Sequence, residues 1–424
     1  MSDAIAEGAA AAPELHLCIV TGQAHANLIP LLMFRPSAIA LIVTPGMSLQ
    51  DKGSTFAKTL QALGVVDNAA SVSIIEFPEQ DYWALEDAAC SHLADLLEKF
   101  PEYKIVLNAT GGTKLISQAW LRALETEESR CSAFYLDTSH ERLEWLQPRR
   151  SSGVIPEVLT VSNGLKAQGF TQRKTNSENP DWVTTAQARK ETTLWLGRNA
   201  EHLDWFFGEM NRALHEYDEK KPPRNVVALK RHVHGDKASD AFLRLDSARV
   251  IDQVSDATPQ EFLVPDISCL TYLKGGWIEE YVWWCVQAAG VHDVCCGMDQ
   301  TSDINPKMNI RNELDVVVAW RNQMLVIECK TAHLGDESNF NKVLHQVSSL
   351  GEKTSGIFGQ RWLVLGRMPR SGRTEEERLL SVERMRLRAA SFNVQLIEPE
   401  HLPQLEVLVG QWMKEFRIDL GQLK

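Results

Sequence analysis

The sequence predicts an α/β fold with a sheet-containing domain at each end and a more helical segment between them. Two observations predict it. Short apolar segments alternate with amphipathic ones through residues 14–150, and two apolar strands that carry charged side chains form a hairpin at residues 311–331. Strand–helix alternation is typical of a parallel, doubly wound sheet. The 424 residues are enough for two or three such domains.

The composition predicts a soluble protein of the cytoplasm. Apolar residues make up 44% of the chain, and the formal net charge of −12 argues against a general nucleic-acid coat protein. The eight cysteines include no CxxC pair, which favours reduced thiols over disulfides or a structural zinc. Residues 1–13 lack the features of a signal peptide and are expected to be a disordered leader, and no apolar run is long enough to span a membrane. We therefore expect no membrane partner.

The first domain is expected over residues 14–150, with five strands separated by helices. The strands are predicted at 15–20, 38–43, 72–77, 104–107 and 131–136, and the helices at 25–34, 55–63, 82–100 and 114–125. Sheets of this kind bind ligands beyond the carboxyl ends of their strands. The loops that follow the strands are therefore the candidate binding loops.

The loop after the fourth strand has a composition suited to binding an anion. It reads Asn108-Ala109-Thr110-Gly111-Gly112-Thr113-Lys114. Its glycines allow backbone N–H groups to approach an anion closely, the following helix points its positive end at the same place, and the lysine adds charge. It lacks the spacing of a P-loop. A turn with a helix N-cap is the alternative interpretation.

The hairpin at residues 311–331 carries three charges that a buried strand does not normally carry. Asp315 precedes three valines, the turn is predicted around Arg321-Asn322-Gln323, and Glu328 and Lys330 close the second strand. Side chains two apart in a strand share a face, and antiparallel pairing would bring Asp315 alongside Glu328. Two carboxylates and an ammonium would then converge, which is typical of a site for a hard divalent cation and an activated water. A surface charge pair and a turn acid are the alternatives for these residues taken singly.

The rest of the chain is predicted to form a linker or small helical domain over residues 151–265 and a last domain over residues 266–424. One amphipathic helix is expected at 192–214 in the linker. In the last domain we expect helices at 276–289, 339–350, 375–390 and 405–416, and strands at 361–365 and 393–397 besides the hairpin.

The hairpin resembles the core of the PD-(D/E)xK nuclease superfamily, which has the restriction-endonuclease-like fold. Asp315 is followed by twelve residues and then by Glu328-Cys329-Lys330, and residues 275–282 resemble the first core helix of these nucleases. The resemblance implies catalytic roles for Asp315, Glu328 and Lys330, with Glu279 or Glu280 as a further acid. It implies Mg²⁺ or Mn²⁺ held by Asp315, Glu328 and the backbone carbonyl of Cys329, and a DNA or RNA substrate.

The first domain resembles the CARF domains of type III CRISPR ancillary effectors. The resemblance rests on the Asn-x-Thr-Gly-Gly-Thr-Lys loop and on the Thr-Gly-Gln that follows the first strand. It implies a homodimer that binds a cyclic oligoadenylate, expected to be the tetramer cA4, across its two-fold axis. The ligand-facing residues would be Thr21, Gly22, Gln23, Asn27, Thr44, Met47, Asn108, Thr110, Gly111, Gly112, Thr113 and Lys114.

Taken together, the first 150 and the last 160 residues resemble the Card1/Can2-like effectors. They imply a metal-dependent nuclease of CRISPR antiviral defence that cyclic oligoadenylate activates. Two alternatives stay open: a ring nuclease that degrades the cyclic nucleotide, and a non-catalytic, nucleotide-sensing regulatory protein. The choice between DNA and RNA, the ring size, and the choice between Glu279 and Glu280 also stay open.

Overall fold

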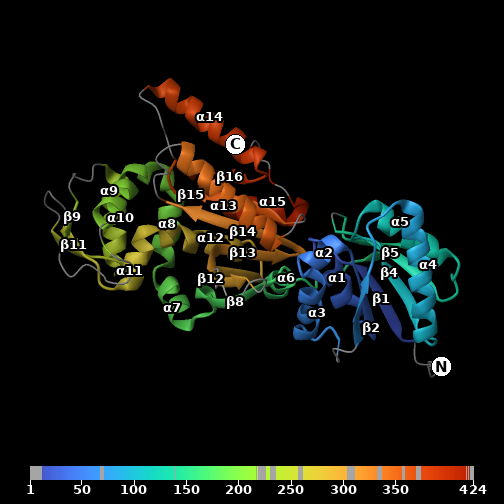
Figure 1. Ribbon diagram of the computed structural model, residues 1–424. Helices are drawn as coiled ribbons and strands as arrows, with labels where there is room; N and C mark the ends of the chain where they lie inside the picture. Colours follow the sequence, from blue (N-terminus) through green and yellow to red (C-terminus); the bar gives the residue numbers. More distant parts are fainter. Residues whose placement is uncertain are drawn as a thin grey trace, which may run out of the picture. The chain divides into compact units, whose positions relative to one another are not determined.

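The computed structural model describes residues 12–66, 71–138, 140–215, 217, 226–229, 235–255, 261–302, 311–331, 337–355, 359–368, 374–416, 418 and 420. Residues 1–11 of the expected leader lie outside this range. The chain forms two compact units, one reaching to Thr171 and the other holding nearly all described residues from Gln172 onward (Figure 1). No helix in the described part of the chain is long and apolar enough to cross a membrane.

The first unit is built on one sheet in the order β3-β2-β1-β4-β5-β6-β7. The first five strands are parallel and the last two are antiparallel. This confirms the predicted doubly wound sheet, and all five predicted strands form. Their bounds are β1 (Glu14–Ile19), β2 (Ala38–Val43), β3 (Val72–Glu76), β4 (Lys104–Asn108), β5 (Cys131–Asp137), β6 (Arg142–Gln147) and β7 (Gly153–Val154).

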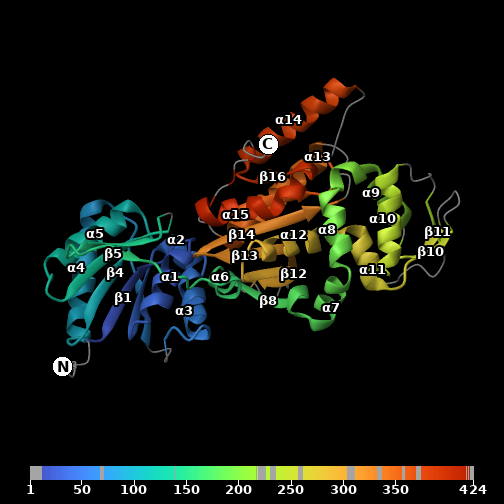
Figure 2. The same cartoon turned by 180° about the vertical axis from the view of Figure 1, so that it is seen from behind.

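Helices cover both faces of this sheet. Helices α4 and α5 pack together on one face, where Leu93 and Trp120 are among the buried residues, and α1, α3 and α6 lie on the other (Figures 1 and 2). The bounds are α1 (His25–Phe34), α2 (Pro45–Leu49), α3 (Lys52–Ala62), α4 (Tyr82–Lys99), α5 (Lys114–Glu125) and α6 (Val161–Ala167). The strand order reverses between β1 and β4, so a crevice is expected where the loops after these two strands diverge.

The second unit contains a six-stranded sheet in the order β16-β15-β14-β13-β12-β8. Strands β12, β13 and β14 are antiparallel, whereas β14, β15 and β16 are parallel. The bounds are β8 (Phe170–Thr175), β12 (Asp293–Ser302), β13 (Arg311–Trp320), β14 (Gln323–Lys330), β15 (Gln360–Leu365) and β16 (Gln395–Ile397). A small separate sheet has the order β10-β11-β9, from β9 (Val227–Ala228), β10 (Asp252–Ser255) and β11 (Glu261–Leu263).

Helices flank the six-stranded sheet on both sides. A large apolar core joins α8, α9, α12 and α15 to one face, and a smaller core joins α13 and α14 to the other. The bounds are η2 (Asn176–Glu178), α7 (Pro180–Ala188), α8 (Lys190–Arg198), η3 (Ala200–Leu203), α9 (Asp204–Leu214), α10 (Asp236–Ser247), α11 (Ile267–Thr271), η4 (Tyr272–Gly276), α12 (Trp277–Ala288), α13 (Glu337–Ser355), α14 (Glu375–Ser391), η6 (Pro399–Gln404) and α15 (Leu405–Glu415).

The single helix predicted over residues 192–214 is wrong. The chain leaves the helical conformation at Asn199, and α8, η3 and α9 follow one another instead. The amide Nδ2 of Asn199 donates to the carbonyl of Trp195 at 2.8 Å, a side-chain bond of the kind that competes with helix propagation. The segment expected as a linker thus contributes β8 and α7 to α10, most of it to the second unit.

Candidate functional sites

The β13–β14 hairpin has the register that the sequence predicts. Arg321 and Asn322 form its two-residue turn, with φ values of 47° and 61°, and positive φ at both positions is typical of the turns that best match strand twist. The ladder runs from Trp320 and Gln323 to Val316 and Ile327, and Asp315 and Glu328 are the next residues of the two strands beyond it. Residues that are directly opposite in an antiparallel pair project to the same face of the sheet.

The three predicted charges converge at the end of β14. The ammonium Nζ of Lys330 lies 2.5 Å from Oε1 of Glu328 and 3.9 Å from Oδ2 of Asp315. The backbone N–H of Cys329 donates to Oδ2 of Asp315 at 2.7 Å. Both carboxylates are buried, with exposed fractions of 7% for Asp315 and 4% for Glu328. Two buried carboxylates therefore share one ammonium that is still partly exposed to water.

This arrangement has an excess of negative charge. Burial and then the charge of Glu328 raise the pKa of Asp315 to about 7. Burial alone would lower the pKa of Lys330, but the charges of Glu328 and Asp315 outweigh it and raise that pKa above its ordinary value. Lys330 is thus an ammonium at neutral pH, which suits the binding of negative charge better than the removal of a proton.

The first turn of α12 is set against this site by an irregular segment. The preceding turn, η4, is a π-helix that ends in two glycines, and Gly275 has a φ of 145°. A Cβ atom at Gly275 would lie 2.9 Å from Oγ1 of Thr331, the residue after Lys330. Single π-turns of this kind recur at functional sites. Glycine at 275 is therefore required both by the backbone and by the close approach to the end of β14.

The two adjacent acids of α12 have different environments. Glu280 is 2% exposed, and the guanidinium of Arg189 binds its carboxylate through two nitrogens, with Nε 3.0 Å from Oε2. Arg189 also stacks over the ring of Tyr272, whose hydroxyl lies 2.8 Å from Oγ1 of Thr193. For Glu279, by contrast, burial and then the charge of Asp315 raise the pKa well above its ordinary value. Of the two acids, it is Glu279 that is near the hairpin charges.

In the first unit, the loops after β1 and β4 are joined by two buried asparagines. Asn27 donates to the carbonyl of Ile19 at 2.8 Å, and Asn108 donates both to the carbonyl of Ala26 and to Oδ1 of Asn27 at 2.9 Å. Oδ1 of Asn108 accepts from the N–H of Thr110 at 3.1 Å. The side-chain amides of both asparagines thus hold the loops around the crevice in place.

The glycines of the loop after β4 allow it to approach β1. A Cβ atom at Gly111 would lie 2.7 Å from the carbonyl oxygen of Ile19, and one at Gly112 would lie 2.6 Å from its Cγ2. Gly112 also has a φ of 88°. Thr113 then caps α5 by accepting from the N–H of Ile116 at 3.3 Å, and Lys114 is exposed as the first residue of that helix. The loop thus has both features that the sequence suggests, a capped turn and a helix N-terminus open to an anion.

A cavity of about 410 Å³ lies at this edge of the sheet. Six of the predicted ligand-facing residues line it: Thr21, Gly22, Thr44, Met47, Gly112 and Thr113. Sequence reasoning missed Glu79 and Gln80 in the loop after β3, although the rule that ligands bind beyond strand ends applies to that loop too. The remaining lining residues are Ile19, Val20, Pro78, Leu85, Leu115 and Ile116.

The other six predicted residues lie in the same loops or at the ends of the adjoining elements, and they do not line this cavity. They are Gln23, Asn27, Asn108, Thr110, Gly111 and Lys114. Asn27 lines a smaller cavity that shares Thr21 and Gly22 with the first one, together with Lys52 and Gln168. The hydroxyl of Thr110 accepts from the N–H of Leu136 at 2.8 Å, which ties the loop to the end of β5.

Comparison with known protein families gives a match within the second unit. Residues 267–416 match the family model described as "Card1-like, endonuclease domain". These residues form a Card1-like endonuclease domain. The predicted acids and Lys330 all lie within it, on β13, β14 and the first turn of α12. No match is found among curated proteins.

Two solved structures share the fold over nearly the whole chain. The crystal structure of protein VC1899 from Vibrio cholerae matches with a TM-score of 0.76 and 18% identity, covering 96% of this chain and 99% of that one. The structure of Can2 from Sulfobacillus thermosulfidooxidans in complex with cyclic tetra-adenylate matches with a TM-score of 0.68 and 20% identity, covering 94% and 99%. The fold of this chain is therefore shared with these two proteins over nearly its whole length.

Proposed function

We propose that this protein is a nuclease of CRISPR antiviral defence that requires a divalent metal and is activated by cyclic oligoadenylate. The observation that carries the proposal is the convergence of Asp315, Glu328 and Lys330 at one strand end inside a Card1-like endonuclease domain. Burying two carboxylates beside one ammonium is costly without a further cation or a chemical use.

The donor set at this site fits Mg²⁺ or Mn²⁺. The oxygens of Asp315 and Glu328 are hard ligands, and Mg²⁺ is commonly bound through one or two carboxylates with water and phosphate oxygens completing its shell. Within the described residues, no group of three or more His, Cys, Asp or Glu side chains is arranged to hold a metal. Water, the substrate phosphate or the carbonyl of Cys329 would therefore supply the other ligands. When bound, the metal would polarise the scissile phosphate and lower the pKa of a water.

The side chains around the metal site have distinct proposed roles. Asp315 is oriented by the N–H of Cys329, and Glu328 by the ammonium of Lys330. Lys330, kept protonated by its two neighbours, would stabilise the charge that develops on the phosphate. Glu279 would contribute a further carboxyl group from α12, while Glu280 holds that helix in place through Arg189.

The first unit would be the sensor. Its cavity lies where the strand order of the sheet reverses, and Gly112, Thr113 and the start of α5 offer backbone N–H groups to phosphate there. We propose cA4 as the ligand because the fold matches that of Can2, whose structure contains it. A cyclic, two-fold ligand fits a site presented twice by a homodimer.

A cleavage panel tests the proposal. The purified full-length protein is incubated with supercoiled plasmid, single-stranded DNA and RNA, with Mg²⁺, Mn²⁺ or EDTA, and with or without cyclic tri-, tetra- or hexa-adenylate. We expect cleavage only when both metal and cA4 are present, and none by Glu328→Ala under any condition. Cleavage by Glu328→Ala at the wild-type rate contradicts the assignment of the site.

The same samples distinguish the two alternatives. Chromatography of the nucleotide shows whether the first unit degrades cA4, as a ring nuclease would. Binding of cA4 without cleavage of cA4 or of any nucleic acid would identify a regulatory protein instead.

A further inference from the structure

Helix α14 has an apolar stripe that the rest of the described chain leaves uncovered. Leu379, Leu380 and Leu387 are 63%, 54% and 64% exposed. Met385 and Ala389, on the other side of the same helix, are buried in the core shared with α13. The amino-terminal half of α14 projects beyond the other elements of the second unit in both views (Figures 1 and 2). A solvated helix rarely exposes three leucines so close together.

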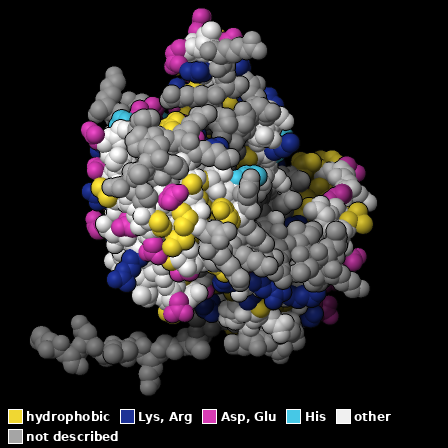
Figure 3. Space-filling view, turned by 90° about the vertical axis from the view of Figure 1, so that its left-hand side faces the viewer, with side chains coloured by type: hydrophobic (Ala, Val, Ile, Leu, Met, Phe, Trp, Pro, Cys, Tyr) yellow, Lys and Arg dark blue, Asp and Glu magenta, His cyan; other side chains and the backbone are white. Residues whose placement is uncertain are grey.

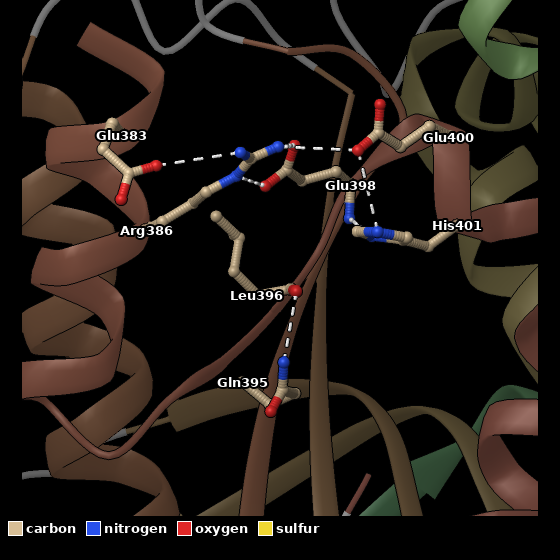
Figure 4. Close-up of polar contacts among 7 residues, drawn as sticks. All are labelled: Glu383, Arg386, Gln395, Leu396, Glu398, Glu400 and His401. Atoms are coloured by element: carbon tan, nitrogen blue, oxygen red, sulfur yellow. Dashed lines mark hydrogen bonds and ion pairs between the residues drawn. The ribbon is translucent and has the colours of Figure 1, made fainter. Parts of the chain in front are cut away.

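The helix is held in this position by an ion pair between Arg386, which is partly exposed, and a buried carboxylate. Nε and an Nη of Arg386 bind the two carboxylate oxygens of Glu398 at 2.6 and 2.8 Å, and Glu398 is only 4% exposed (Figure 4). Bidentate pairs of this kind are geometrically specific. Arg386 also lies 3.8 Å from Glu383 on its own helix. The exposed stripe therefore belongs to an anchored element whose orientation is set.

A groove lies beside the carboxyl-terminal half of α14. It has a volume of about 410 Å³, and it is walled by the start of α13 and by the side of α14 that carries Leu387. Its lining residues are Phe340, Asn341, Arg384, Met385, Leu387, Arg388 and Ser391. Each copy of the protein thus has an apolar projection at one end of α14 and a partly apolar hollow at the other.

The two ends of α14 also differ in charge. Its first turn carries Glu375, Glu376 and Glu377, and Asp and Glu side chains gather at its tip (Figure 3). Its second half carries Arg384 and Arg388 beside the groove. A helix that is acidic at one end and basic at the other is complementary to a second copy of itself in the antiparallel orientation.

We propose that α14 is a self-association element that pairs with α14 of a second copy about a two-fold axis between Glu383 and Arg384. In this register Leu380 faces Leu387 of the second copy, and Glu383 faces its Arg384. Every contact is made twice, as a two-fold interface requires. The leucines are seven residues apart, two helical turns, so they lie on one side of the helix.

The charge pattern favours a second copy over a nucleic acid. Phosphate backbones are bound by surfaces of uniformly positive charge. A strand that followed the stripe toward the tip of α14 would meet three successive glutamates. This surface is separate from the proposed catalytic residues, so the inference goes beyond the proposed function and can be tested without nucleotide or metal.

Cysteine cross-linking tests the register. The full-length variant Leu380→Cys/Leu387→Cys is made in a Cys90→Ser background, because Cys90 is an exposed native thiol, and it is oxidised with copper–phenanthroline. Within one helix the two thiols are about 10 Å apart along the axis, too far for an internal disulfide. We expect a covalent dimer on a non-reducing gel from the double variant only. In each single variant, the cysteines of the two copies would lie about 10 Å apart along the helix direction, on either side of the two-fold axis. Each single variant should therefore stay monomeric on the gel.

A charge exchange in the same cysteine background tests the polar contacts. Glu383→Arg alone and Arg384→Glu alone each create two like-charge contacts, and we expect each to slow cross-linking about fivefold. The combined Glu383→Arg/Arg384→Glu exchange should restore the rate, because Arg386 retains its pair with Glu398. Unchanged melting temperatures would show that these exposed positions leave the fold intact.

Two results would overturn the proposal. One is the absence of a covalent dimer from the double variant at every protein concentration tested, which would also be the result if the stripe binds a different protein or a nucleic acid. The other is equal cross-linking by the single and double variants, because that would mean random collision and no defined register. Neither result depends on whether the protein cleaves nucleic acid.

Discussion

The carboxylate of Glu280 is bound by the guanidinium of Arg189, which lies 91 residues earlier in the chain, at the junction of α7 and α8. For the neighbouring Glu279, burial and the negative charge of Asp315 outweigh the charge of Lys330 and raise its pKa. Two consecutive glutamates on the same helix turn therefore serve different purposes. Glu280 is paired with Arg189, and Glu279 lies near the charges of the hairpin.

Replacing Glu280 should destabilise the protein. In Glu280→Ala, Arg189 stays buried without its carboxylate, so we expect the free energy of unfolding to fall by about 3–5 kcal/mol. Urea-induced unfolding measures this. The matched control is Glu279→Ala, which removes an acid from a site with surplus negative charge and should change stability by less than about 1 kcal/mol. A similar loss of stability in both variants would contradict the assignment.

Removing the charge of Lys330 should slow cleavage without preventing activator binding. In Lys330→Met the site loses the cation that neutralises Glu328, and we expect the cleavage rate at saturating metal and cA4 to fall about 10²–10³-fold. Lys330→Arg keeps the charge and should retain more activity than the methionine variant. Single-turnover cleavage gives the rates, and calorimetry checks cA4 affinity. A methionine variant as fast as the wild type would exclude an electrostatic role for Lys330.

A side chain at Gly275 should disturb the approach of α12 to β14. Gly275→Ala combines an unfavourable φ with a Cβ atom 2.9 Å from Oγ1 of Thr331. Gly290→Ala is the control, because Gly290 also has a positive φ, 95°, but no atom lies within 4 Å of the added Cβ. We expect Gly290→Ala to cost about 1–2 kcal/mol and Gly275→Ala about 1–3 kcal/mol more. Only Gly275→Ala should also reduce cleavage. Equal effects on stability and activity would show that the contact with Thr331 is unimportant.

Lys114 should contribute to nucleotide affinity and not to stability. Its side chain is exposed at the start of α5, next to the cavity, so Lys114→Ala should weaken cA4 binding about tenfold, as loss of one charge-assisted hydrogen bond predicts. Lys99→Ala removes the same charge at the far end of α4 and is expected to leave affinity unchanged. Calorimetry with the two variants separates a local contact from a general effect of net charge. Identical affinities would argue against this loop as the phosphate site.

The hairpin and the first sheet could be predicted because their signals are local. Alternation of side chains fixes which residues of β14 share a face, and a two-residue turn at Arg321 and Asn322 fixes the register with β13. In the first unit, uninterrupted apolar strands separated by turn residues leave few other assignments. The expected pairing of Asp315 with Glu328 follows from such short-range information alone.

The features that were missed depend on residues distant in sequence. Nothing in residues 277–282 shows that Arg189 binds Glu280, so the choice between the two glutamates could not be made. Strand β12 was missed because Gly297, with a φ of 58°, and several polar residues interrupt its apolar pattern. The glycine is needed there because a Cβ atom would lie 2.1 Å from Nδ2 of Asn176, on a segment that the sequence alone did not connect with the sheet.

The edge strand β8 limits how this protein can be divided. It spans Phe170–Thr175, yet it completes the sheet whose hairpin begins at Arg311, and Nε of Arg173 donates to Oγ1 of Thr301 on β12 at 3.0 Å. A fragment that started at Asp266 would omit this strand as well as Arg189, exposing the backbone of β12 and leaving Glu280 buried without a counter-ion. We therefore expect that a fragment starting at Asp266 does not fold independently. A fragment made to isolate the second unit should begin upstream of Phe170.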